Sequence, residues 1–179
     1  AEVSFKHDVY AYTGKEREPS PVVRLGGKRL KKDRDYTLSY EDNLLPGTAS
    51  VTVAGAGDYE GEIKASFMIR LKTPDLVSAE SVSAGARIKW KAVKGADRYK
   101  IYRREKNSTK WKRIETVRGR LFYTDKSAEN KTVYYYTVRA FHKNGEHSAA
   151  SKPGLKVKVR GKKFTDSPLV DHIHLSPHH

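Results

Sequence analysis

The stretch Val133–Ala140, which reads VYYYTVRA, decides how the second half of the chain folds. Alternate residues share a face, so Tyr134 and Tyr136 lie on one side and Tyr135 and Arg139 on the other. A helix would scatter these side chains around its axis, whereas a strand sorts them into two sets. We therefore predict a strand with one face in a core and the other forming an aromatic and basic surface.

Short alternating runs on either side of this stretch predict further strands, separated by turn residues. We expect them at residues 87–91, 99–104, 111–117, 121–124, 148–151 and 155–159, which together with Val133–Ala140 make seven. Asn144-Gly145 just beyond the opening stretch is a hairpin signal. Alternation turns Trp90 and Tyr99 toward the same core as Tyr134.

A set of residues spread over this segment matches a known domain pattern. The set comprises Pro74, Trp90, the run Val93-x-Gly95-Ala96-x-x-Tyr99-x-Ile101-Tyr102-Arg103, Tyr123-x-Asp125, Tyr134-x-Tyr136-x-Val138-x-Ala140, Asn144-Gly145 and Ser148-x-x-Ser151. With them, residues 74–159 resemble a fibronectin type III domain. The resemblance implies that Trp90 is the core tryptophan between two sheets, and that Tyr134 is the tyrosine corner, its ring buried and its hydroxyl bonded to nearby backbone. Tyr99 and Tyr136 complete the structural aromatic residues that we assign.

Residues 1–71 show short alternating runs too, and none is of helix length. We expect strands at residues 22–25, 36–40, 48–53 and 63–69, bounded by turns that contain glycine or proline. A second pattern is carried by Tyr12-Thr13-Gly14, Pro19, Gly26-Gly27-Lys28, Leu30, Asp35–Tyr40, Asn43, Pro46–Ala49 and Gly55–Ile69. With these residues the segment resembles the bacterial Ig-like β module that recurs in tandem on secreted and surface proteins of Gram-positive anaerobes.

The predicted fold class is therefore all-β, with two tandem antiparallel β-sandwich domains, one Ig-like and one of the fibronectin type III kind. We assign residues 1–71 to the first domain, 72–74 to a linker, 75–160 to the second domain and 161–179 to a His-rich tail that we expect to be disordered. Because Pro74 restricts its own backbone and that of Thr73, the short linker should join the domains stiffly and end to end.

The net charge of +15 is concentrated in one part of the chain. Residues 72–160 carry 23 Lys and Arg against 8 Asp and Glu, whereas residues 1–71 and 161–179 are each balanced. Such a field can attract a polyanion: an anionic wall polymer, an acidic glycan or a nucleic acid. The alternative is a lysine-rich strand surface that only keeps the domain soluble. Nucleic acid is the weaker partner, because no RNA- or DNA-binding motif is present.

Strand alternation collects candidate ligand-binding residues on one outer face of the second domain. These residues are Lys100, Tyr102, Arg104, Tyr135, Arg139 and Phe141. The grouping requires that the strands carrying Tyr102 and Tyr135 be neighbours, as the fibronectin type III resemblance implies. Aromatic rings beside cations can stack on sugar rings while the cations hold acidic groups. Alternatively, the same side chains pack across strands and only stabilise the sheet through cation–π pairs.

No catalytic constellation is readable in the sequence, so we expect no enzyme activity and no cofactor. The chain has no Cys, which excludes disulfides and cysteine-ligated zinc. His172 and His174 in the tail are a weak metal-binding alternative, and we expect no other metal. Asp35, Asn43 and Asp58 fit calcium in residue type, but such side chains in turns more often bond to backbone amides.

Two functions remain open. The preferred one is a non-catalytic stalk or adhesion segment of a secreted or cell-surface bacterial protein, a location that the two resemblances imply. The other is an accessory binding module for an acidic polysaccharide or cell-wall polymer, serving an enzyme elsewhere in the parent protein. The partner would be such an anionic polymer or a host surface protein. No apolar run approaches the roughly 18 residues of a membrane span, and none follows the N-terminus. We therefore expect no membrane insertion and no signal peptide. We also expect the protein to be a monomer.

Overall fold

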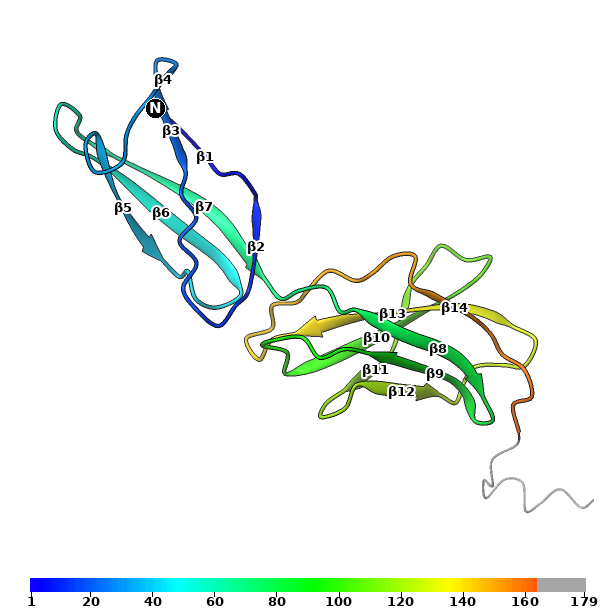
Figure 1. Ribbon diagram of the computed structural model, residues 1–179. Coiled ribbons are helices and arrows are strands. Elements are labelled where there is room, and N and C mark those ends of the chain that lie inside the picture. Colours follow the sequence, from blue (N-terminus) through cyan, green and yellow to red (C-terminus); the bar gives the residue numbers. More distant parts are fainter. Residues whose placement is uncertain (164–179) are drawn as a thin grey trace, which may run out of the picture.

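The computed structural model describes residues 1–163, which form strands, turns and loops without a helix. Figure 1 shows two β-sandwich modules placed end to end, with the chain passing once from the first to the second. The predicted all-β fold class with two tandem sandwiches is confirmed. The expectations for the tail beyond residue 163, including metal binding by His172 and His174, lie outside the described residues. In residues 1–163 no helix is long and apolar enough to cross a membrane.

The first module packs a four-stranded sheet against a three-stranded one. The larger sheet has the order β2 (Val9–Ala11), β7 (Glu62–Arg70), β6 (Gly47–Gly55) and β5 (Tyr36–Glu41). The smaller sheet has the order β1 (Glu2–Ser4), β3 (Val22–Leu25) and β4 (Lys28–Arg29). All strand pairs are antiparallel except β2 with β7, which run parallel. Alternation along the strands turns one face of each sheet into the core, so that Val23 of the smaller sheet meets Tyr36 and Val53 of the larger.

The second module also consists of two sheets. One has the order β12 (Phe122–Asp125), β9 (Gly85–Trp90) and β8 (Leu76–Val82). The other has the order β11 (Lys112–Val117), β10 (Arg98–Glu105), β13 (Val133–Phe141) and β14 (Leu155–Lys158). All pairs in both sheets are antiparallel. Strand β13, which contains Val133–Ala140, lies inside its sheet and is paired on both sides.

The second module has seven strands, but they are not the seven that the sequence predicts. Strand β8 is absent from the predicted set, and the predicted strand at residues 148–151 is wrong. One backbone hydrogen bond joins that segment to β13, from the Ser148 N–H to the carbonyl of Ala140 (2.8 Å). The other hydrogen bonds that hold it beside β13 involve side chains. The Ser148 hydroxyl accepts the N–H of Ala140 (2.9 Å), and the Thr137 hydroxyl donates to the carbonyl of Ser151 (2.5 Å). Side-chain bonds here replace the ladder that would define a strand.

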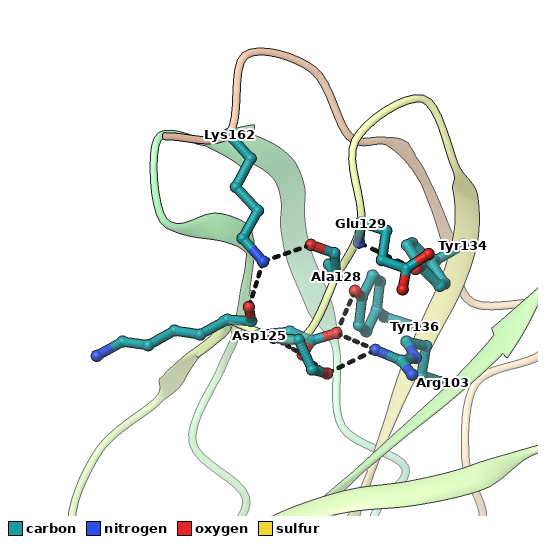
Figure 2. Close-up of polar contacts among 9 residues, drawn as sticks. Arg103, Asp125, Ala128, Glu129, Tyr134, Tyr136 and Lys162 are labelled. Atoms are coloured by element: carbon teal, nitrogen blue, oxygen red, sulfur yellow. Dashed lines mark hydrogen bonds and ion pairs between the residues drawn. The ribbon is translucent and has the colours of Figure 1, made fainter. Parts of the chain in front are cut away.

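The four aromatic residues assigned to structure lie inside the second sandwich: Trp90, Tyr99, Tyr134 and Tyr136 are all buried. The rings of Trp90 and Tyr99 pack together with 5.4 Å between their centroids. The Tyr134 hydroxyl accepts a hydrogen bond from the backbone N–H of Glu129 at 3.0 Å (Figure 2), which is the bonding pattern of a tyrosine corner. Truncating such a ring leaves a cavity that costs about 3–5 kcal/mol.

A buried carboxylate joins three strands at one end of this core. Asp125 on β12 is 1% exposed and accepts hydrogen bonds from the Tyr136 hydroxyl (2.6 Å) and the Arg103 guanidinium (2.8 Å), as Figure 2 shows. It also accepts one from the Ser127 hydroxyl (2.6 Å). Burial alone would raise the pKa of Asp125, but the bonds from Ser127, Tyr136 and Arg103 hold that pKa below its ordinary value. Burial and the bond to the carboxylate raise the pKa of the Tyr136 hydroxyl. The cluster therefore keeps its ion pair at neutral pH and ties β10, β12 and β13 together.

The two modules meet at a joint made by side chains from both. Leu71, the first residue after β7, is buried and packs in the hydrophobic core of the second module. Tyr12 also packs against that core, and its ring lies edge-on to the ring of His142 with 5.8 Å between centroids. The side-chain amide of Asn144 donates to the carbonyl of Pro46 across the joint at 3.0 Å. The core of the second module therefore extends into the first.

Candidate binding surface

The register of β10 and β13 places the predicted ligand-binding residues on the outer face of the β11-β10-β13-β14 sheet. Lys100 is directly opposite Arg139, and Arg104 is directly opposite Tyr135. Tyr102 lies between Lys100 and Arg104 on the same face, since residues two apart on a strand point the same way. The condition that the strands carrying Tyr102 and Tyr135 be neighbours is met. The six predicted residues nevertheless fall into three groups with different surroundings.

Arg104 stabilises the hairpin between β10 and β11. Its guanidinium carbon lies 4.1 Å from the centroid of the Tyr135 ring and 5.4 Å from that of Trp111. Its Nη1 donates to the carbonyl oxygen of Ser108 at 3.2 Å, with two longer bonds to other carbonyls of the same turn. The guanidinium donors are thus directed to the chain's own backbone. Arg104 and Tyr135 therefore fit the alternative in which side chains of this face pack across strands and only stabilise the sheet.

Phe141 lies at the other end of the face and is covered. Its side chain is only 8% exposed, because the Lys100 ammonium lies 4.2 Å and the Arg98 guanidinium 5.4 Å from its ring centroid. The ring of His147 packs on it as well, with 5.1 Å between centroids. The assignment of Phe141 as a ligand-contacting ring is therefore corrected: long side chains that fold over the ring remove it from the accessible surface.

Tyr102 and Arg139, at the centre of the face, line a pocket. The Arg139 guanidinium carbon lies 5.7 Å from the centroid of the Tyr102 ring. The pocket has a volume of about 280 Å³, and we name it the Tyr102 pocket after its central ring. It is lined by Tyr102, Trp111, Thr137, Arg139, Ala150 and Lys152. Its wall comes partly from the segment after the hairpin, which the Thr137–Ser151 hydrogen bond holds against β13.

The charges at the Tyr102 pocket are available to a ligand. Within residues 1–163 neither Arg139 nor Lys152 forms an ion pair with a carboxylate. The polar side-chain contact of Arg139 is a 3.4 Å approach of its Nη1 to Nδ1 of His147. An aromatic ring beside a cation that lacks a carboxylate partner is suited to a sugar ring that carries a negative group. The pocket thus keeps the binding interpretation open for its two predicted members.

Sequence reasoning missed several residues of the Tyr102 pocket. Trp111 directly precedes β11 and stands at the start of an expected strand. Strand alternation alone therefore does not predict that its ring lies beside Tyr102. Lys152 lies directly after the predicted strand at residues 148–151, which the structure does not contain, so strand alternation gave it no face. Thr137 is two residues from Arg139 on the same strand, so alternation places both on the outer face. This spacing is the signal in the sequence that identifies Thr137 as a neighbour of Arg139.

The other polar candidates have structural partners. The Asp35 carboxylate accepts the backbone N–H of Lys31 at 2.7 Å and pairs with the Arg34 guanidinium at 2.8 Å. The Asn43 amide donates to the carbonyl of Arg17 at 3.0 Å. Across residues 1–163 no group of three or more His, Asp or Glu side chains is arranged to hold a metal ion. The turn interpretation of Asp35 and Asn43 is therefore the one that their contacts support.

Comparison with known proteins finds one family model that matches part of the chain and several similar solved structures. The family described as GH85 endohexosaminidases, C-terminal domain, matches residues 70–157, which is the second module with its joint. No curated protein matches the chain. Among solved structures, a Fn3-like protein from Clostridium thermocellum is 26% identical over 53% of this chain and 94% of that one, with a TM-score of 0.39.

Two other solved structures are similar over more of the chain. A beta-1,2-glucanase from Parabacteroides distasonis is 21% identical over 69% of this chain and 19% of its own, with a TM-score of 0.44. The chicken CNTN1 FN1-FN3 domains are 18% identical over 64% of this chain and 43% of their own, with a TM-score of 0.44. The strand order of the two modules makes the protein a tandem of β-sandwich modules. Its second module is fibronectin type III-like and similar to the C-terminal domain of endohexosaminidases.

Proposed function

We propose that this chain is a non-catalytic accessory segment of a bacterial glycan-active enzyme, and that its second module binds an anionic glycan. The observation that carries the proposal is the Tyr102 pocket, where Tyr102 and Trp111 lie beside Arg139 and Lys152. The match of residues 70–157 to the C-terminal domain of endohexosaminidases supports a place beside a catalytic domain. The Ig-like resemblance of residues 1–71 supports a secreted or cell-surface parent protein.

The pocket divides recognition between rings and charges. The faces of Tyr102 and Trp111 would pack against the C–H groups of a sugar ring, which is an apolar contact with fixed geometry. Arg139 would hold a carboxylate or sulfate on that sugar, since a guanidinium offers two parallel donors to such a group. Lys152 would add a second positive charge at the opposite wall. A neutral sugar would keep only the first of these interactions and would therefore bind more weakly.

Calorimetric titration with tetragalacturonate, and with neutral chitotetraose as the comparison, tests the site. Tyr102→Ala and Arg139→Gln should each weaken binding of the anionic sugar by about tenfold. Lys106→Gln removes the same charge from an exposed turn residue outside the Tyr102 pocket and should have little effect. Circular dichroism of each variant checks the fold. Unchanged affinity in both pocket variants would rule the pocket out, and equal affinity for the two sugars would rule out the role of charge.

A second candidate function is that of a spacer, and the joint between the modules favours it. Leu71 and Tyr12 pack into the core of the second module, and Asn144 bonds to Pro46. Such contacts would hold two modules at a fixed distance, as a stalk requires. Small-angle scattering would show a single elongated particle if the joint is stiff. A range of compact and extended particles would contradict the spacer function and leave glycan binding untouched.

A further inference from the structure

The opposite sheet of the second module carries an exposed ring that the Tyr102 pocket does not involve. Phe122 lies on β12, the edge strand of the β12-β9-β8 sheet, and its side chain is 40% exposed. Within residues 1–163 it is the only Phe, Tyr or Trp with an exposed side chain, since the others are buried or half-buried. A single exposed apolar side chain is ordinary on a protein surface. The case for a site at Phe122 therefore depends on the groups that surround its ring.

Positive charges surround the Phe122 ring. The guanidinium carbon of Arg87 lies 5.7 Å and that of Arg120 5.8 Å from the ring centroid. Lys89 is directly opposite Phe122 in the strand register. A hydrogen bond from Arg87 Nε to the Thr124 hydroxyl (3.2 Å) fixes the first guanidinium beside the ring. Two cations over one ring repel each other, so a bound anion would relieve more energy here than at an isolated cation–π pair.

These cations lack carboxylate partners in the part of the chain that the structure describes. Arg87, Lys89 and Arg120 form no ion pair there. The acidic residue that the register brings nearest to Arg87 is Glu80 on β8, and it too is outside ion-pair distance. On the groove side, burial raises the pKa of the Tyr123 hydroxyl and the nearby charge of Glu115 raises it further. The three cations Arg87, Lys89 and Arg120 still outnumber Glu80 and Glu115, so the local charge is positive on balance.

A groove beside Phe122 could hold a ligand next to these cations. It has a volume of about 560 Å³ and runs along β12 and the loop that follows. Its lining residues are Arg120, Phe122, Tyr123, Thr124, Lys126 and Ser127. The Ser127 hydroxyl is already bonded to Asp125 and Arg103, which leaves the Tyr123 and Thr124 hydroxyls for a ligand. A sugar bearing an acidic group requires such a set of side chains: the ring for its C–H face, the hydroxyls for its hydroxyl groups, and the cations for its charge.

We propose that this groove, which we name the Phe122 groove, is a second site for a glycan chain bearing carboxylate or sulfate groups. It goes beyond the proposed function, because the Phe122 groove and the Tyr102 pocket belong to the two different sheets of the sandwich. One module therefore holds two glycan segments on opposite sides. A module with two such faces links neighbouring chains of an anionic polymer instead of only attaching to one.

Titration calorimetry with two probes, tetragalacturonate for carboxylate and a heparin-derived tetrasaccharide for sulfate, tests the second site. The unaltered protein should bind two equivalents of at least one probe, and the probe that binds identifies the acidic group. Arg139→Gln should leave one equivalent, bound in the Phe122 groove. Adding Arg120→Gln to that variant should weaken the remaining binding by at least tenfold, whereas adding Lys106→Gln should not.

Phe122→Ala provides an independent variant with the same expected loss. Its folding is not at risk, because the side chain is largely outside the core, and circular dichroism verifies this. One equivalent in the unaltered protein that Arg120→Gln and Phe122→Ala both leave intact, or affinities unchanged by both substitutions in the Arg139→Gln background, overturns the Phe122 groove. Failure of the Tyr102 pocket has a different signature: Arg139→Gln would leave binding intact while Arg120→Gln alone abolishes it.

Discussion

The ring of Tyr12, in the first module, lies against the backbone of Gly95 in the second. A Cβ atom on Gly95 would stand 2.5 Å from Cε1 of that ring and 2.9 Å from Cδ2 of Leu71. Gly95 also has a φ of 84°, which side chains rarely adopt. The glycine is thus required twice, once by its own turn and once by the neighbouring module. This contact makes the joint a packed interface in addition to a covalent connection.

Gly95→Ala should therefore destabilise the protein more than its backbone conformation alone accounts for. The matched control is Gly119→Ala, whose φ of 72° carries a similar backbone cost but whose added methyl would meet no atom within 4 Å. That backbone cost is about 1–2 kcal/mol. Overpacking against Tyr12 should add roughly 1–3 kcal/mol for Gly95→Ala. Chemical denaturation measures both variants, and equal losses would show that the Tyr12 contact contributes nothing.

Leu71→Ala should destabilise the second module, although Leu71 directly follows the last strand of the first. Its side chain is 3% exposed within the second core, so its truncation should cost about 2–5 kcal/mol. Both tryptophans, Trp90 and Trp111, lie in the second module, so their fluorescence reports the unfolding of that module. Leu121→Ala, at a side chain 38% exposed in the same module, is the control and should change little. If Leu71→Ala lowered the stability only in an unfolding transition that tryptophan fluorescence does not report, Leu71 would not belong to the core of the second module.

How far the sequence predicts this fold depends on whether alternation survives in each strand. In β13 it does, so the buried side of Tyr134 and Tyr136 and the neighbouring position of β10 follow from residue order and the family resemblance. In β8 it does not, because the pairing with β9 shifts between Leu76 and Ser78 and breaks the two-residue period. A register shift is a property of the pair of strands, which a single strand's sequence does not reveal.

The candidate site shows the same limit at the level of side chains. Parity places Phe141 on the outer face but says nothing of the long cations that fold over it, which come from β10. The sequence likewise predicts that Phe122 lies on a strand, but it does not predict that this strand is at the edge of its sheet. At that edge the Phe122 ring stays exposed between Arg87 and Arg120. Exposure of an aromatic ring depends on neighbours distant in sequence. Those neighbours decide whether the ring can meet a ligand.

Acid should destabilise the second module through Asp125. Its pKa in the folded protein lies below the ordinary value, so its contribution to stability is present above the unfolded-state pKa of about 3.9 and is lost as the pH falls through the folded-state pKa. Asp125→Asn should cost about 3 kcal/mol at neutral pH, because it leaves the half-buried Arg103 charge without its partner. The variant should also lose part of the dependence on acid pH. Urea denaturation between pH 7 and pH 3, followed by tryptophan fluorescence, measures both effects.

The control for this prediction is Asp97→Asn, which removes a carboxylate that pairs with Arg98 and Arg118 at the surface. Exposed pairs contribute about 0–1 kcal/mol, so this variant should stay close to the unaltered protein. If Asp97→Asn and Asp125→Asn cost the same, burial of the Asp125 cluster has no energetic consequence.

Thr137→Val should weaken the Tyr102 pocket without removing any charge or ring. The Thr137 hydroxyl donates to the carbonyl of Ser151 at 2.5 Å, and this bond holds the segment that carries Ala150 and Lys152 against β13. Valine keeps the volume but leaves the carbonyl without that donor, which costs about 1–3 kcal/mol locally when the group stays buried. The segment should then open more often, so that Lys152 spends less time at the pocket wall. Hydrogen exchange at residues 148–152 should speed up, and affinity for tetragalacturonate should fall several-fold.

Thr116→Val on β11 is the matched control, because it makes the same replacement on the same sheet at a hydroxyl with no hydrogen bond in residues 1–163. It should leave both exchange and affinity unchanged. Faster exchange at residues 148–152 with full affinity would mean that Lys152 takes no part in binding, and the Tyr102 pocket would then depend on Arg139 alone for its charge. Unchanged exchange would mean instead that the Ser148 bonds to Ala140 are sufficient to hold the wall.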